Sequence, residues 1–128
     1  MNLEIRNLMK LCQKIGLICC LTLSAATAFA ASGQMTTLAI SAGDSDALAL
    51  RSDGSVWSWG TNQFGEMGIS NLTCNYYPMR VVGVSNVSKI SAGEVHSLAI
   101  ETNGTVWAWG DNSGGELGNT NGNSPVPV

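Results

Sequence analysis

The sequence predicts an all-β fold built from two antiparallel sheet repeats of about 50 residues each. Residues 40–68 recur at 90–118 without a gap, and 15 of these 29 positions are identical, which indicates an internal repeat. Each copy places an Asp-Gly or Asn-Gly pair between two apolar runs, a strong signal for a β-hairpin. Each copy then ends in a glycine-rich turn, GEMG or GELG.

The first 30 residues have the composition of a secretory signal peptide. Three basic side chains lie among the first 14 residues, and an uncharged stretch from 15 to 30 ends in Ala-Phe-Ala. We predict cleavage between Ala30 and Ala31 and therefore a secreted, periplasmic or cell-envelope protein. The apolar part at 15–23 is shorter than the roughly 20 residues of a spanning helix, so an uncleaved membrane anchor is the less favoured alternative.

The remaining chain is acidic and carries one cysteine. It holds three basic and eight acidic side chains, a net charge of −5. This charge repels nucleic-acid phosphates and anionic lipids, so we predict no nucleic-acid partner and no membrane association after signal cleavage. The lone Cys74 is predicted to be a free thiol or one half of an intermolecular disulfide.

The repeat also divides the chain. A lead-in at 31–39 precedes a first repeat at 40–89 and a second, truncated repeat at 90–128. In both repeats Ser-Ala-Gly precedes the hairpin and predicts a short strand that ends at a glycine corner. Aligning PMRV (78–81) with PVPV (125–128) requires a three-residue length change, which predicts a surface loop before these segments.

Tryptophans define one face of each repeat. Successive strand residues point to opposite faces, so Trp57 and Trp59 share one face, as do Trp107 and Trp109. A tight turn precedes each tryptophan strand, and we predict that both residues of its Asp-Gly or Asn-Gly pair have positive φ angles. A sheet with apolar side chains on both faces cannot stay folded alone, so it must stack on copies of itself.

These residues carry a family resemblance. The pattern ISAG…HSLAI…NGTVWAWGDNSGGELG…P resembles the signature of the regulator of chromosome condensation repeat family over about residues 36–128. The resemblance implies the blades of a β-propeller, with about seven blades of roughly 50 residues each. It also implies scaffolding or guanine-nucleotide exchange on a small GTPase, with a nuclear prototype. Two blades do not close a ring, so we expect either the N-terminal piece of a longer product or self-assembly that completes the ring.

No residue of the chain is predicted to be catalytic, to bind a cofactor or to ligate a metal. Paired tryptophans can stack sugars, but packing between blades is favoured. The single His96 lacks partners for catalysis or zinc, so a structural hydrogen-bonding role is predicted. Glu66 and Glu116 recur once per repeat and are interpreted as turn-forming acceptors. Residues 44–46 open like a calcium loop but lack its later glycine and glutamate.

One stretch is not explained by the repeat: ISNLTCNYYP, from Ile69 to Pro78. It holds Cys74, Tyr76 and Tyr77, which we predict to form a contact loop, since loops on rigid scaffolds often bind partners. The favoured function is an exported, non-enzymatic binding or scaffolding module for a protein or glycan partner. The alternatives are part of an extracellular enzyme whose active site lies on blades or domains absent from this chain, and a nucleotide-exchange factor, which the export signal disfavours.

Overall fold

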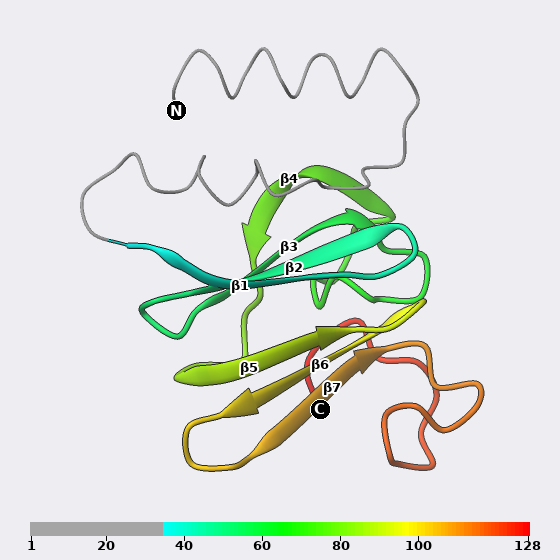
Figure 1. Cartoon of the computed structure of the whole chain (residues 1–128). Helices are drawn as coiled ribbons and strands as arrows, with labels where there is room; N and C mark the ends of the chain where they lie inside the picture. The colour runs from blue at the N-terminus through cyan, green and yellow to red at the C-terminus, as the bar shows by residue number, and fades with distance from the viewer. Residues whose placement is uncertain (1–34) are drawn as a thin grey trace.

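The computed structural model describes residues 35–128, which form two antiparallel sheets (Figure 1). The predicted signal peptide and its cleavage position between Ala30 and Ala31 lie outside the described residues. In the described part, no helix has the length and apolar character needed to cross a membrane.

The first sheet, blade 1, has four strands in sequence order. They are β1 (Thr37–Ala42), β2 (Asp46–Arg51), β3 (Val56–Thr61) and β4 (Cys74–Arg80). Each strand pairs with the next in antiparallel register, so β4 lies at an edge of the sheet. The all-β prediction of antiparallel repeats is therefore confirmed.

The second sheet, blade 2, repeats this order with β5 (Val87–Ala92), β6 (His96–Glu101) and β7 (Val106–Gly110). The predicted repeat boundaries at Ile40 and Ile90 fall inside β1 and β5, because the sequence repeat is recognised only from the middle of each first strand.

The hairpin turns depend on glycine alone for positive φ. Gly54 has a φ of 74° and Gly104 a φ of 89°, whereas the preceding Asp53 has no positive φ. The Arg51 N–H donates to the Ser55 carbonyl at 3.0 Å, which leaves a three-residue loop. This is a turn followed by a glycine bulge, not the two-residue turn with two positive φ angles that Asp-Gly favours.

Residues 124–128 pair with β7 where β4 pairs with β3 in blade 1, through a bridge between Gly110 and Ser124 and two hydrogen bonds between Ala108 and Val128. The third strand of each blade is paired on both sides of a bulge. The partners that flank the bulge are Met79 and Asn75 in blade 1 and Val128 and Ser124 in blade 2. Val128 lies 49 positions after Met79, and Ser124 lies 49 positions after Asn75, whereas the rest of the repeat has a spacing of 50 positions. Pro78 therefore corresponds to Pro127, and the predicted three-residue length change is wrong: the pairing register, not the first proline, sets the alignment.

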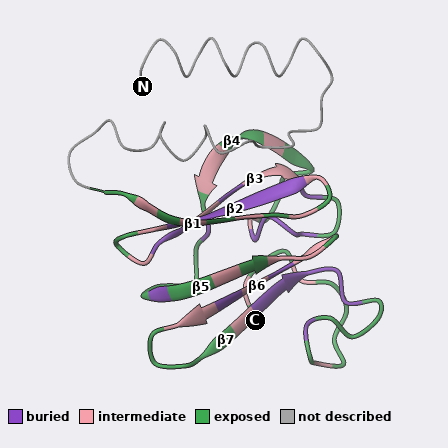
Figure 2. Cartoon of the chain, viewed as in Figure 1, coloured by how far each residue is buried: buried purple, intermediate pink, exposed green. Residues whose placement is uncertain are grey.

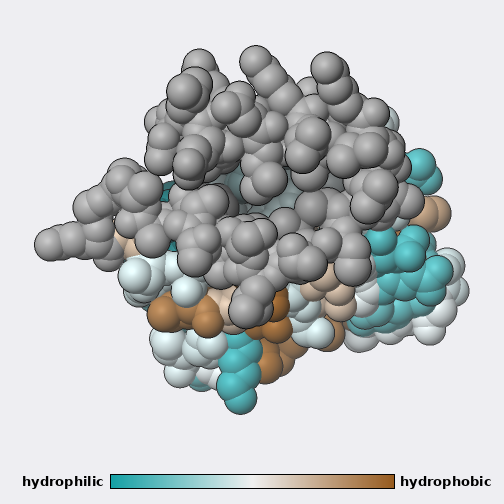
Figure 3. Space-filling view, turned by 45° about the horizontal axis from the view of Figure 1, so that its top comes forward, coloured by the Kyte–Doolittle hydropathy of each residue, from teal (hydrophilic) through white to brown (hydrophobic). Residues whose placement is uncertain are grey.

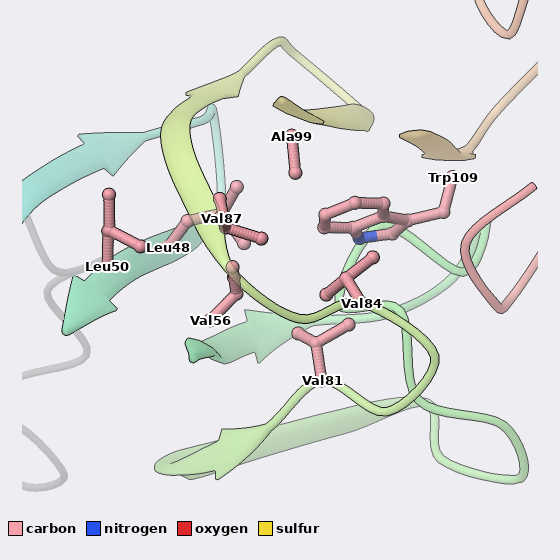
Figure 4. Close-up of a cluster of buried hydrophobic side chains, with 8 residues drawn as sticks. All are labelled: Leu48, Leu50, Val56, Val81, Val84, Val87, Ala99 and Trp109. Atoms are coloured by element: carbon pink, nitrogen blue, oxygen red, sulfur yellow. The ribbon is translucent and has the colours of Figure 1, made fainter. Parts of the chain in front are cut away.

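The main apolar core lies between the two blades (Figure 4). Blade 1 and the connecting segment contribute the aliphatic side chains of Leu48, Leu50, Val56, Val81 and Val84, and blade 2 contributes Val87, Ala99 and the fully buried Trp109. Figure 2 shows this burial concentrated in β2 and in β7. Because residues of both blades share this core, the predicted stacking of repeats is confirmed. Each large apolar side chain buried here stabilises the pair by about 1.5–3 kcal/mol.

Candidate interaction site

The two blades pack head to tail. On blade 2, Trp109 pairs with Ser97 and Trp107 with Ala99, and this tryptophan face lies against blade 1. Blade 1 meets it with the aliphatic face that carries Leu48. The packing role predicted for the tryptophans is thus confirmed for Trp107 and Trp109. Contacts of this heterologous kind can continue from blade to blade.

The main chain of Glu66 joins the blades by hydrogen bonds. Its carbonyl accepts from the Trp109 indole Nε1–H at 2.8 Å and from the Ser97 hydroxyl at 2.9 Å. All three residues are buried, so the indole and the hydroxyl would otherwise lack water as a partner. The turn after β3 therefore acts as the docking point for the next blade.

The side chain of Glu66 holds this turn in shape. Its carboxylate accepts three hydrogen bonds, from Thr61 Oγ1 (2.9 Å), Gln63 N (3.2 Å) and Phe64 N (2.8 Å). The predicted role as a turn-forming acceptor is confirmed. Glu116 does the same with a single bond from Gly114 N at 2.9 Å, and its side chain is exposed.

A second determinant of the turn was missed by sequence reasoning. The Asn62 amide Nδ2 donates to the carbonyls of Ile69 (2.7 Å) and Leu72 (2.8 Å), and its Oδ1 accepts from Met67 N at 2.9 Å. Asn112 bonds its own turn in the same way through Oδ1. The signal was present, since asparagine is identical at this position in both repeats.

The outer face of blade 2 repeats the docking surface of blade 1 without an occupant among residues 35–128. Val56 is 0 % exposed and its counterpart Val106 is 60 % exposed. We define the blade 2 outer face by Leu98, Ile100, Val106 and Glu116, the counterparts of Leu48, Leu50, Val56 and Glu66.

Glycines show the same asymmetry. A Cβ on Gly65 would lie 2.5 Å from Pro125 Cα, and one on Gly68 would lie 2.9 Å from the Trp109 indole nitrogen. Their counterparts Gly115 and Gly118 meet nothing within 4 Å. The close-approach surface is therefore present on blade 2 but is not filled by any described residue.

The predicted contact residues lie together on the edge strand β4. Cys74, Tyr76 and Tyr77 were expected in a loop, but Cys74–Arg80 is a strand. Ser58 pairs with Met79 and Gly60 pairs with Asn75, so residues 76–78 lie opposite the single residue Trp59 and form a bulge in β4. Tyr76 is 65 % and Tyr77 50 % exposed, and Cys74 is an exposed free thiol. Figure 3 shows apolar and polar side chains side by side on the described surface.

The remaining candidates are His96 and the acidic residues at 44–46. The His96 ring covers Gly93, where an added Cβ would collide with it. In the segment that resembles the opening of a calcium loop, Asp46 lies in the interior and Asp44 at the surface. Within residues 35–128, no cluster of three or more His, Cys, Asp or Glu side chains has a geometry suited to a metal ion.

Comparison with known sequences identifies the repeat. A model described as the regulator of chromosome condensation (RCC1) repeat matches residues 53–100, and a second RCC1 repeat model matches 38–66 and 87–116. The chain belongs to the RCC1 repeat family. None of the curated proteins matches this sequence.

Solved RCC1 propellers share the fold. Yeast RCC1 (Prp20) bound to Kap60 is 25 % identical with a TM-score of 0.70, over 75 % of this chain and 25 % of that chain. Prp20p of Saccharomyces cerevisiae is 24 % identical with a TM-score of 0.68, over 74 % and 25 %. Human WBSCR16 is 21 % identical with a TM-score of 0.66, over 76 % and 26 %. The chain thus spans about a quarter of these RCC1-type structures, and its two sheets are propeller blades.

Proposed function

We propose that this chain is an exported, non-enzymatic binding or scaffolding module that presents the edge strand β4 to a protein partner. The observation that carries the proposal is the exposure of Tyr76 and Tyr77 on a bulge of a well-packed sheet. Tyrosines are enriched at interface hot spots because they bury a large apolar ring and keep a hydroxyl for hydrogen bonding.

The structural neighbours favour a protein over a glycan as the partner. One yeast RCC1 (Prp20) structure contains Kap60, and another is described with binding properties toward Gsp1p and histones. These partners belong to those proteins. This chain shares the blade scaffold with them, and the partners named for those two structures are all proteins.

A further RCC1 blade is the partner we propose for the blade 2 outer face. The face repeats the surface of blade 1 that already holds a tryptophan-bearing blade, including the exposed Val106 and the unfilled approach at Gly115 and Gly118. The blade comes either from further repeats of the same polypeptide or from another copy.

The tyrosines provide the test of the binding proposal. We expect the Tyr76→Ala/Tyr77→Ala chain to lose at least about tenfold in affinity for its protein partner, because two aromatic contacts of more than about 1 kcal/mol each are removed. The measurement is quantitative co-purification from the envelope fraction of the native host. Val82→Ala, at a position 77 % exposed outside β4, is the matched control and should retain the partner. Equal recovery with all three chains would contradict the proposal.

The export part of the proposal has a separate test. We expect the N-terminus of the mature protein to be Ala31, because the preceding residues fit a signal peptide that ends in Ala-Phe-Ala. N-terminal sequencing of protein from fractionated cells measures this directly. An unprocessed chain in the cytoplasm would exclude export and would revive the nucleotide-exchange alternative.

A further inference from the structure

A carboxyl group without a partner lies inside the interface between the blades. Asp46 begins β2, is 6 % exposed, and both of its side-chain oxygens are buried without a hydrogen bond. It shares a strand face with Leu48 and Leu50, which pack into the interblade core. A buried ionised carboxylate without compensating bonds carries a large desolvation cost, so this position conflicts with the packing around it.

The neighbouring main chain fixes the location of this carboxyl group. An added Cβ on Gly43 would collide with Asp46 Oδ1 on one side and would crowd the Gly93 carbonyl of blade 2 on the other. Nearby, the Ala92 N–H donates to the Ser41 hydroxyl at 2.8 Å and so joins β5 to β1. Asp46 thus lies at the corner where the first strands of the two blades meet.

The charged groups around Asp46 increase the conflict. Glu66, from the turn after β3, and Asp44, from the corner before β2, are both acidic. Burial, together with these two charges, raises the pKa of Asp46 from 3.8 to about 7, and the main-chain N–H of Asp46 offsets only part of this rise. From blade 2, Lys89 on β5 is exposed and the His96 ring on β6 covers Gly93, and neither is among the groups that shift the pKa of Asp46.

We propose that Asp46 makes the contact between blades 1 and 2 pH-sensitive: the blades are held tightly while this carboxyl is protonated and loosen once it ionises. The folded-state pKa is higher than the unfolded value, so the stabilisation is complete below about pH 4 and is lost as the pH rises through 7. Asp53 and Asp111 have lowered pKa values through hydrogen bonds from Ser55 and Ser113, so their effect appears only at more acidic pH. This proposal does not depend on the proposed function.

The test is the pH dependence of thermal unfolding of the full chain. We expect the wild-type melting temperature to fall by more than about 5 °C between pH 5.5 and 8.5, and that of Asp46→Asn to fall by much less. Asp44→Asn, which removes an exposed acid of the same corner, is the control and should keep most of the wild-type fall. Parallel curves for wild type and Asp46→Asn would overturn the proposal, because the fall would then come from other groups.

Two measurements on the wild-type chain do not require a folded variant. NMR titration of the Asp46 carboxyl carbon should give a midpoint near 7, and a midpoint near the ordinary 3.8 would overturn the proposal. Hydrogen exchange at Ala92 N–H, corrected for the intrinsic pH dependence, should accelerate as Asp46 ionises. Unchanged protection across the titration would show that ionisation does not loosen the blades.

Discussion

Replacing Trp109 by alanine is expected to lower the free energy of unfolding by about 3–5 kcal/mol, because it removes the largest fully buried side chain of the interblade core. The substitution also removes a hydrogen-bond donor to the buried Glu66 carbonyl. Such a loss is a large fraction of the about 5–15 kcal/mol that stabilises a typical domain. Urea denaturation of the full chain, followed by far-ultraviolet circular dichroism, measures it.

Two variants separate the parts of this effect. Trp109→Phe keeps most of the apolar volume but lacks the indole N–H, so we expect a smaller loss of about 1–3 kcal/mol. Val106→Ala, on the blade 2 outer face, should stay within about 0.5 kcal/mol of wild type in a monomeric chain on which no further blade is docked. If Val106→Ala cost as much as Trp109→Ala in such a monomer, the assignment of the two faces would be wrong.

The blades show how one sequence position acquires two environments. Val56 and Val106 are identical residues at the same place in the repeat, yet only Val56 is covered, because blade 2 lies on it. Burial in this fold is therefore decided by the neighbouring blade rather than by the blade's own sequence. That dependence is what one-dimensional repeat architectures share.

Sequence reasoning succeeded where a local pattern carries the information. Alternation in the strands placed Trp107 and Trp109 on one face, and the repeat predicted stacked sheets. It failed for residues 124–128. A bulge sets the register in which they pair with β7, so Pro127, not Pro125, corresponds to Pro78. It did not find the docking role of the Glu66 carbonyl, since every residue has a main-chain acceptor. It also did not find the buried state of Asp46, since burial there arises from the second blade.

The second large effect is expected for Glu66→Ala, which should lower the free energy of unfolding by about 2–4 kcal/mol. The substitution removes a buried carboxylate that accepts from Thr61, Gln63 and Phe64, so the turn loses its fixed shape. The displaced turn no longer aims its carbonyl at Trp109, and the contact between the blades weakens. Removing an acid beside Asp46 offsets part of this loss above neutral pH. The measurement is urea denaturation at pH 6.

Glu116→Ala is the matched control, because it deletes the same side chain from the same turn of the second repeat. Its carboxylate is exposed and accepts one bond, from Gly114 N, so we expect a change within about 0.5 kcal/mol. Equal losses for the two variants would mean that the carboxylate stabilises each turn by itself. The interface would then gain nothing from it, and the turn after β3 would not be the docking point for the next blade. We expect the larger loss for Glu66→Ala because its carboxylate accepts two more hydrogen bonds than that of Glu116 and because blade 2 packs on the first turn alone among the described residues.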